Sequence, residues 1–460
     1  MVSSRSSATS GSGSGSGKSA GAGTRPAARS GWVRFMSASI SPCTSFFEKT
    51  RTRSALTSDT AVPQSRPAGS RSAPRMAHAA WMVTAVFMLS NSPTPLYVSW
   101  QRALGFSSGT LTVIFALYIA GLLGTLLVAG QLSDRYGRKP VLLPGLAAAL
   151  IACALFATAS SVAMLAVARL LTGIAVGVIV SAGMASVIDL AGTERRKAAL
   201  LASVAMVLGA GLGPLLAGIA AQTAAHPVAL VFGVEFVILL SALAVALRLP
   251  RNQPAQAPDD APPLRLPSVP VHNRRHVASG VAVFGPGITA TSFVLALGPS
   301  LLARLLHVRS PLLAGGMACA MFIAATGVQF VARRGSIRAT FVAGTVATTL
   351  SMVMLCIAVH ASSAAVLVAA ALFAGAGQGL GQLGGLTLIG LHVPDARRAE
   401  ANAVMNIGGY LPAGLMPVMT GYAIDRVGFT AGATGFAVAL TLIALAAGAA
   451  AVLALRHDND

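Results

Sequence analysis

The sequence predicts an all-α membrane protein in which twelve transmembrane helices form two six-helix bundles. Of its 460 residues, 55% are hydrophobic and only 10% are charged, and the mean hydropathy is +0.73. A soluble domain carries roughly 25% charged residues, so this composition excludes an ordinary soluble enzyme. The apolar residues are also grouped into long runs with short connections, which is the pattern of a multi-pass membrane protein.

Residues 1–75 differ from the rest of the chain and are expected to be a disordered basic leader. This Ser-, Gly- and Arg-rich stretch holds 11 basic residues, and its acids are Glu48 and Asp59. Such a composition cannot bury a core. Its Arg- and Ser-rich, acid-poor make-up also resembles an organellar transit peptide. The alternative is that the protein starts at Met36 or Met76 and that the leader does not belong to it.

From Met76 onward, the apolar runs are each about 20 residues long, enough to cross a bilayer as a helix. A Pro-rich linker over residues 250–276 divides them into an N-terminal bundle (76–249) and a C-terminal bundle (277–460). The expected spans are 77–99, 109–131, 140–160, 162–188, 198–221, 228–248, 277–303, 311–331, 341–360, 364–391, 401–424 and 430–455.

The basic residues predict the orientation in the membrane. With a cytoplasmic amino terminus, the inner loops hold 17 Lys and Arg, whereas the outer loops hold four: Arg102, Arg304, Arg309 and Arg426. This distribution obeys the positive-inside rule and places both termini in the cytoplasm. The formal charge of +20 is therefore explained by topology, and we expect no nucleic-acid partner.

The two halves resemble each other when one is shifted by about 202 residues along the other. The shift superimposes Gly173, Gly177 and Gly183 on Gly375, Gly379 and Gly385. A duplicated set of six helices predicts two bundles with a substrate path between them.

The most specific local motif lies between the second and third spans and reads Gly130-Gln-Leu-Ser-Asp134-Arg135-Tyr-Gly137-Arg138-Lys139. Gly130 and Gly137 would allow close helix approach and a tight reversal of the chain. The motif resembles the GxLxDRxGRR/K loop of the major facilitator superfamily. The resemblance implies the fold of that family, a secondary transporter rather than an enzyme, and Asp134 as a conformational latch against the eleventh helix. The alternative is a charge cluster that only sets topology.

The motif has a further expected partner in the first half and an incomplete counterpart in the second half. Asp189 ends the fourth span and is expected to join the cytoplasmic ion-pair network around Asp134 and Arg138. The corresponding loop of the second half reads Ala332-Arg333-Arg334-Gly335, without the acid, so the latch is expected on one side only.

Two charged residues inside spans are candidates for proton coupling. Arg169 lies about seven residues from the outer end of the fourth span, and Glu235 lies at the same depth in the sixth. Intramembrane charges are costly unless they are paired or face a wet cavity. Arg169 resembles the family's fourth-helix arginine, which is associated with proton coupling, and Glu235 could carry the proton. The alternatives are an Arg169–Glu235 pair and an Arg169 side chain that snorkels to the interface.

The fifth span carries Gly209, Gly213, Pro214 and Gly218 in a pattern that resembles the GxxxGPxxGG motif of drug and proton antiporters, with Ala217 in place of one glycine. The resemblance implies efflux. The alternative is close packing of small residues without a transport role.

Polar residues within the spans mark a candidate substrate cavity: Asn91, beside the prolines that break the first span, and Gln378, Gln382 and Asn406 in the tenth and eleventh. Hydrogen bonds between helices are the other interpretation. Four tyrosines are expected to anchor the chain at the membrane interface instead: Tyr97, Tyr118, Tyr410 and Tyr422.

No GxxxxGK[ST] motif is present, and the four cysteines have no metal-ligand spacing, so we expect no cofactor and no metal. The overall expectation is proton-coupled export of a small organic compound or drug by alternating access, by a monomer in the bacterial inner membrane. The lack of an acid in the first span favours neutral or anionic substrates. Uptake by symport and a membrane sensor without flux are the alternatives.

Overall fold

The computed structural model describes residues 69–191, 194–249, 267–394 and 397–455. Most of the predicted leader and of the linker lie outside these residues, as do the side chains of residues 69–73, Asp134 and Arg196. Every regular element in the described ranges is a helix.

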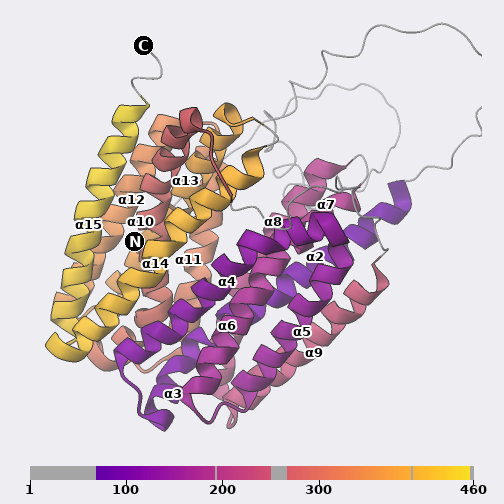
Figure 1. Cartoon of the computed structure of the whole chain (residues 1–460). Coiled ribbons are helices and arrows are strands. Elements are labelled where there is room, and N and C mark those ends of the chain that lie inside the picture. Colours follow the sequence, from indigo (N-terminus) through magenta and orange to yellow (C-terminus); the bar gives the residue numbers. More distant parts are fainter. Residues whose placement is uncertain (1–68, 192–193, 250–266, 395–396, 456–460) are drawn as a thin grey trace, which may run out of the picture. The chain divides into compact units, whose positions relative to one another are not determined.

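The first half of the described chain forms one helical bundle, drawn from indigo to magenta in Figure 1. Its α-helices are α2 (Gly69–Asn91), α3 (Tyr97–Leu104), α4 (Ser108–Tyr136), α5 (Arg138–Ala157), α6 (Val162–Val178), α7 (Met184–Asp189), α8 (Arg195–Thr223) and α9 (Pro227–Arg248).

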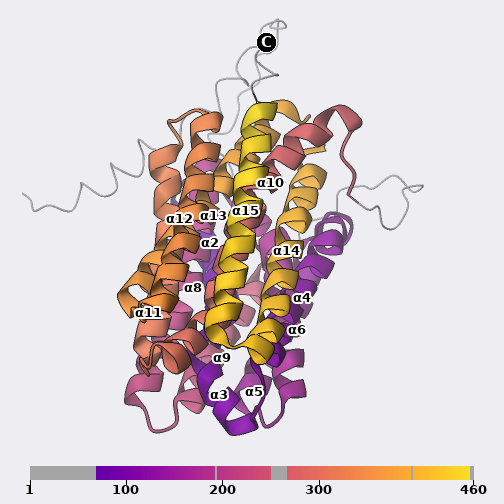
Figure 2. The ribbon, with the colours of Figure 1, turned by 90° about the vertical axis from the view of Figure 1, so that its left-hand side faces the viewer.

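The second half forms the other bundle, drawn from red to yellow in Figures 1 and 2. It consists of α10 (Arg274–Ser300), α11 (Pro311–Ala332), α12 (Ile337–His360), α13 (Ala364–His392), α14 (Arg398–Val427) and α15 (Phe429–Ala454). The two halves meet mainly where α8 packs on α11 and where α4 packs on α14.

The described helices form the twelve predicted spanning units. The first unit joins α2 to α3 through the turn Thr94–Leu96, and the fourth joins α6 to α7 through the π-helical turn Ile179–Gly183. Ten of the units are long and apolar enough to cross a membrane, and the two others are those of α2 and α14, which carry more polar residues. The predicted fold class is therefore confirmed. Helix α2 begins at Gly69, inside the segment expected to be leader.

The first span breaks where its prolines predict. Pro93 and Pro95 have no N–H to continue the helix, and the chain changes from α2 to a 3-10 turn at Thr94 before α3 resumes at Tyr97. The backbone N–H of Ser92 still donates to the carbonyl of Met88, one turn back. The break therefore lies inside the protein, where neighbouring helices surround it.

The repeated glycines make the same helix contact in each half. A methyl group on Gly173 of α6 would lie 2.1 Å from the carbonyl oxygen of Tyr118 on α4. A methyl group on Gly375 of α13 would lie 2.1 Å from the carbonyl oxygen of Met321 on α11. Residues 202 positions apart thus hold equivalent helix pairs at backbone distance, as the internal repeat predicts.

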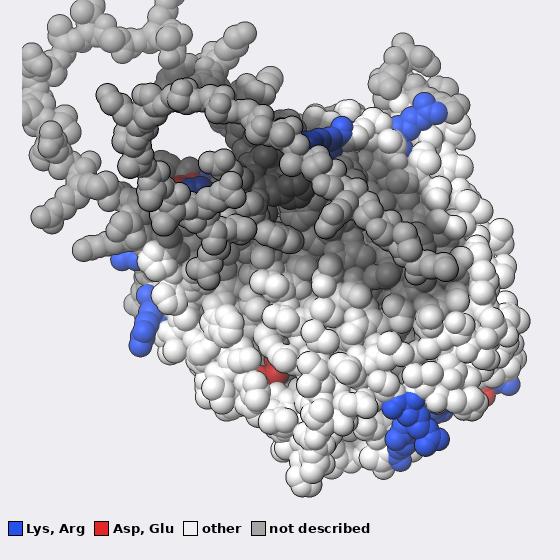
Figure 3. All heavy atoms as spheres, turned by 180° about the vertical axis from the view of Figure 1, so that it is seen from behind, with Lys and Arg blue, Asp and Glu red and all other residues white. Residues whose placement is uncertain are grey.

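The helices expose apolar side chains along their flanks, as the lipid-facing surface of a membrane protein does. Figure 3 shows most charged side chains near the ends of the helices, with a largely uncharged wall between them. Leu208, Leu212 and Leu216 of α8 and Val237 of α9 are among the exposed large residues. These flanks support a multi-pass membrane protein. We call the end that carries α3 the outer end, after the orientation that the charges predict, and the opposite end the inner end.

Candidate functional site

A cavity of about 140 Å³ lies between the two halves, with side chains from both in its wall. Three of the four predicted cavity residues line it: Asn91 from α2 and Gln378 and Gln382 from α13. The fourth, Asn406, is half-buried on α14 and is not part of the wall. Apart from Arg169, the described side chains of the wall are uncharged, and aromatic rings make up much of it.

Arg169 is one of the residues of this wall, and only 1% of the residue is exposed. Its Nη1 donates to the carbonyl oxygen of Ser90 at 2.6 Å, and its Nε donates to the hydroxyl of Tyr97. Its Nη2 has no hydrogen-bond partner among the described residues. The side chain therefore lies inside the protein, so the interpretation that it snorkels to the interface is wrong.

Aromatic rings surround the guanidinium group of Arg169. Its central carbon lies 5.1 Å from the ring centre of Tyr97, 5.7 Å from that of Phe115, 5.8 Å from that of Phe156 and 5.9 Å from that of Tyr118. Ring faces attract a cation by about 2 kcal/mol or more when water is absent. These contacts offset part of the cost of burying a charge without a carboxylate partner.

Glu235 is also buried, with 3% of the residue exposed. Its Oε1 accepts a hydrogen bond from the hydroxyl of Ser92 at 2.5 Å, and its Oε2 has no partner among the described residues. The carboxyl group thus lies against the break in the first span and has no cation within ion-pair distance in the described part of the chain.

Arg169 and Glu235 form hydrogen bonds with the same short segment of the first span rather than with each other. Arg169 holds the carbonyl of Ser90, and Glu235 accepts from the side chain of Ser92, two residues further along. The ion pair between them, which is the alternative interpretation, is not formed. Instead, the broken end of the first span lies between the cavity arginine and the buried acid and contacts both.

The antiporter-like motif of α8 packs this helix on two neighbours. A methyl group on Gly209 would lie 2.4 Å from the carbonyl oxygen of Thr84, and one on Gly213 would lie 2.2 Å from that of Met88, so both glycines bring α8 against α2. Gly218 makes a similarly close approach to the backbone of Pro311 on α11. The carbonyl of Pro214 in turn faces Gly315 of α11. The motif therefore supports both the packing within the first half and the contact between the halves.

At the inner end, the loop motif turns the chain as predicted. Helix α4 ends at Tyr136, Gly137 adopts a positive φ of 90°, and α5 begins at the next residue. The side chain of Arg135 is exposed, and that of Asp134 lies outside the described residues. Gly130, in contrast, has no atom within 4 Å of the place a methyl group would take, so the close helix approach expected there is wrong.

The expected ion-pair network at the inner end includes Arg138 and Asp189. The Nε of Arg138 lies 3.2 Å from an oxygen of Asp189, and its Nη1 donates to the hydroxyl of Ser133 at 2.8 Å. These contacts tie the ends of α4 and α7 to the start of α5. Because both charged side chains are partly exposed, the pair contributes only about 0–1 kcal/mol.

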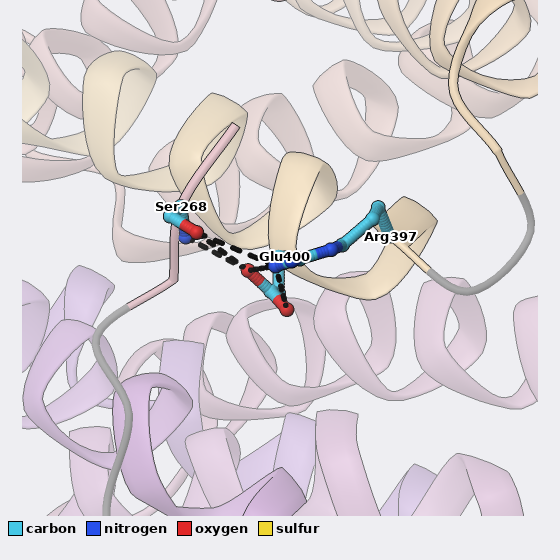
Figure 4. A network of polar contacts seen from close by, with 3 residues as sticks. All are labelled: Ser268, Arg397 and Glu400. Atoms are coloured by element: carbon cyan, nitrogen blue, oxygen red, sulfur yellow. Dashed lines mark hydrogen bonds and ion pairs between the residues drawn. The ribbon is translucent and has the colours of Figure 1, made fainter. Parts of the chain in front are cut away.

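A second polar cluster at the inner end joins Ser268, near the end of the linker, to the start of α14 (Figure 4). The backbone N–H and hydroxyl of Ser268 both donate to Glu400, in the first turn of α14, and Arg397 donates to both of its oxygens. The hydrogen bond from the Ser268 backbone is the largest influence that holds the pKa of Glu400 below its ordinary value. The carboxylate also favours the start of the helix through the helix dipole.

At the outer end, Asp425 joins the two halves. Its carboxylate accepts hydrogen bonds from the backbone N–H groups of Ser108 at 2.9 Å and Gly109 at 2.7 Å, in the first turn of α4. Burial opposes its ionisation, but hydrogen bonds from Ser107, Gly109 and Ser108 outweigh this effect, and the pKa of Asp425 lies below its ordinary value. A carboxylate of α14 thus caps a helix of the other half.

Further contacts close the outer end between the halves. The hydroxyl of Ser300 on α10 donates to the side chain of Gln101 on α3 at 2.9 Å. A methyl group on Gly421 of α14 would lie 2.8 Å from the carbonyl oxygen of Ser108. Glycine at this position lets α14 reach α4 at backbone distance, so the halves are in direct contact at this end.

The residues around Asp425 repeat the loop motif, and this repeat is the sequence signal that indicates the contact. Residues 421–428 read Gly-x-x-x-Asp-Arg-x-Gly, the same spacing as residues 130–137. The final glycines also share a backbone conformation, with φ and ψ of 90° and 164° at Gly137 and of 86° and 166° at Gly428. Helices α4 and α14, which pack on each other, therefore end in the same motif at opposite ends of the protein.

Three of the four tyrosines expected at the membrane interface lie in the interior. Tyr97 is fully buried beside Arg169, and Tyr118 and Tyr410 line the cavity. Tyr422 is half-exposed near the outer end.

Comparison with known sequences places the chain among membrane transporters. A family model described as Major Facilitator Superfamily matches residues 79–336. The chain is 38% identical over 74 residues to the multidrug resistance protein MdtL of Escherichia coli O45:K1 (strain S88 / ExPEC), and this stretch covers 16% of the chain and 19% of MdtL. It is 33% identical over 112 residues to an uncharacterized transporter of Rickettsia felis, covering 23% of the chain and 28% of that protein. The matched stretches thus span less than a third of these relatives.

Solved structures show the same fold at low sequence identity. A mutant of the nucleoside transporter NupG has a TM-score of 0.65 and 13% identity, covering 82% of this chain and 99% of that one. A bacterial homolog of the human lysosomal transporter Spinster, in an inward-facing and unoccupied conformation, has a TM-score of 0.64 and 15% identity, covering 84% and 98%.

Proposed function

The chain belongs to the Major Facilitator Superfamily, and we propose that it is a proton-coupled exporter of a small organic compound that works by alternating access. Membership in this family makes it a transporter rather than an enzyme. The observation that carries the proposal is the cavity between the halves, with Arg169 in its wall and Glu235 on the other side of the same broken segment. We place the protein in the bacterial inner membrane as a monomer with both termini in the cytoplasm.

Alternating access requires that each end of the protein can close in turn. The outer end is closed here by Asp425 and by the glycines that bring α14 onto α4. Because α4 and α14 carry matching motifs at opposite ends, we propose that Asp134 makes the corresponding cap on the start of α14 when the inner end closes. Helices α4 and α14 would then hold the outer end closed in one state and the inner end closed in the other.

Proton coupling is assigned to Glu235 and Arg169. Burying a charged carboxylate without a cation costs several kcal/mol. Such a group therefore takes up a proton when a conformational change buries it, and releases the proton when a conformational change exposes it. Glu235 reaches the broken segment through Ser92, and Arg169 reaches it through Ser90. A change in the charge of Glu235 would therefore move the segment that also positions the cavity arginine.

Export is favoured over uptake by two sequence features. The α8 motif resembles that of drug and proton antiporters, and the 74-residue stretch that is 38% identical to MdtL aligns with a multidrug resistance protein. An uptake symporter would use the same fold with the opposite direction of net flux. A membrane sensor would bind a ligand without transport.

The decisive experiment reconstitutes the full chain in liposomes that contain a pH-sensitive dye. A compound selected by a growth screen, in cells that lack their own exporters, is loaded under an imposed pH gradient of either direction. We expect flux of the compound opposite to the proton flux, and loss of the proton signal in Glu235→Gln, with substrate exchange in the absence of a gradient retained. Glu194→Gln, which breaks an exposed pair with Lys197, is the matched control and should keep both.

Three results would replace this proposal. Flux of compound and protons in the same direction would establish uptake by symport. Ligand binding without any flux would establish a sensor. An intact proton signal in Glu235→Gln would remove this acid from the coupling.

The proposed inner latch has its own test. Asp134→Asn should lower the transport rate while leaving the amount of protein in the membrane unchanged, whereas Glu194→Gln, which breaks an exposed pair with Lys197, should not. Wild-type rates in Asp134→Asn would refute the latch.

A further inference from the structure

The guanidinium group of Arg169 presents a buried nitrogen for which the described protein supplies no acceptor. Its Nε and Nη1 are bonded to Tyr97 and Ser90, whereas its Nη2 is buried without a partner. Leaving a buried charged donor unsatisfied costs more free energy than leaving a neutral one unsatisfied. A ligand oxygen in the adjoining cavity would supply the missing acceptor.

The charge of the cavity also favours a negative ligand. Arg169 is positively charged, and none of the described lining residues is Asp or Glu. The buried acid Glu235 is bonded to Ser92 and does not line the cavity. In a wall of low dielectric constant, an unneutralised guanidinium group attracts an anion strongly, and it can bind a carboxylate through two parallel hydrogen bonds.

The remaining wall fits a flat apolar body with a hydrogen-bond donor. The rings of Phe87, Phe115, Phe322 and Tyr410 line the cavity. The Oε1 atom of Gln378, in the same wall, is buried and lacks a donor among the described residues. A hydroxyl or N–H group on the ligand would satisfy it.

We propose that the cavity binds a small aromatic organic acid, with its carboxylate on Nη2 of Arg169, its ring among the aromatic side chains and a donor group toward Gln378. This inference rests on the proposed transport function, of which it defines the substrate class. Arg169 is then a substrate-binding residue, and not solely a residue of proton coupling.

The test compares three probes that share a ring and a hydroxyl group and differ in charge: salicylate, salicylamide and 2-hydroxybenzylamine. Binding to the purified full-length protein is measured by calorimetry at neutral pH. We expect salicylate to bind at least about tenfold more tightly than salicylamide, because its hydrogen bonds to Arg169 are charge-assisted. The amine should bind most weakly.

Variants of Arg169 test whether this residue causes the preference for salicylate. Arg169→Gln should lower the affinity for salicylate to that for salicylamide and leave the latter unchanged. Arg169→Lys, which keeps the charge but not the planar fork, should fall between. Arg304→Gln, at the outer surface, is the control and should match the wild type. If Arg169→Gln does not fold, the ranking of the three probes on the wild type decides by itself.

Equal affinities, tightest binding of the amine, or no binding of any probe would overturn the proposal. Its failure is distinct from that of the proposed function. Salicylate binding without proton-driven flux would refute the function and keep the site. Proton-driven flux of a neutral or cationic compound, without a preference for salicylate, would refute the proposed binding site and keep the proposed function.

Discussion

The carboxylate of Asp425 accepts a hydrogen bond from the backbone N–H of Gly109, 2.7 Å away, so a side chain of the second half caps a helix of the first. The neighbouring N–H of Ser108 donates to the same carboxylate. These two N–H groups belong to the first turn of α4 and have no partner within their own helix. The closed outer end therefore depends on a contact that opening must break.

Replacement of Asp425 should open the outer end. Asp425→Ala removes both hydrogen bonds and the charge, and loss of a helix cap costs about 1 kcal/mol, about a fivefold shift of the equilibrium. We expect faster labelling of a cysteine placed at Ser292, in the cavity, by an impermeant maleimide added from the outer side. The measurement uses a background without the native cysteines. Asp425→Asn, which keeps one acceptor, should be intermediate, and an unchanged rate in both would contradict the prediction.

A larger residue at Gly421 should hold the outer end open. The first side-chain carbon of Val would lie 2.3 Å from the hydroxyl of Thr112 and 2.8 Å from the carbonyl of Ser108, too close for the halves to meet. Gly421→Val should label rapidly at Ser292→Cys from the outside and should not transport. Gly435→Val, where α15 has open space, is the control. Normal transport by Gly421→Val would show that the helices need not come this close.

The outer contact should not respond to pH between about 5 and 8. Since the pKa of Asp425 in the closed form lies below its ordinary value of 3.8, the contact stabilises the closed form above that value. It is lost only as the pH falls through the lowered pKa. In Glu235→Gln, which removes the proposed coupling proton, labelling at Ser292→Cys is measured with and without Asp425→Ala at each pH, because the ratio of the two rates cancels the pH dependence of the thiol itself. This ratio should be equal at pH 5 and 8. A ratio closer to one at pH 5 would assign the pH response to the outer end.

A methyl group at Gly213 should destabilise the first half. It would lie 2.2 Å from the carbonyl oxygen of Met88, and overpacking of this kind costs typically 1–3 kcal/mol. Gly213→Ala should therefore lower the melting temperature of the protein in detergent. Gly233→Ala, in α9 with no atom within 4 Å of the added carbon, should match the wild type. Equal melting temperatures would show that α8 shifts to accommodate the group.

Much of the fold follows from periodicities that are local in sequence. Apolar runs of the length of a bilayer predict the spanning units, and the two prolines after Ser92 predict the break in the first span. The repeated glycines at positions 173 and 375 predict equivalent helix contacts because only a residue without a side chain allows such an approach. Asn91, Gln378 and Gln382 reach the cavity because polar residues within a span must face the protein interior.

The errors concern which face of a helix meets which neighbour. Tyr118 and Tyr410 line the cavity because of the rotation of α4 and α14, which depends on packing between the halves and not on either segment. Asn406 lies on another face of α14 for the same reason. The sequence around Asp425 looks like an ordinary charged end of a helix, and the partner of Asp425, Gly109, is 316 residues away. No local pattern specifies that contact, although the repeat of the loop motif hints at it.

The single charge in the cavity wall has an electrical consequence. If Arg169 binds an anion, the loaded cavity is neutral and the empty one carries a positive charge. A membrane potential, negative inside, then acts on the empty protein and favours the form whose cavity opens to the cytoplasm, by up to about 2.3 kcal/mol per charge for each 100 mV. The potential would thus help to return the unloaded transporter to the side where it collects its cargo, while the neutralised cavity adds no voltage dependence to the outward step of the loaded form.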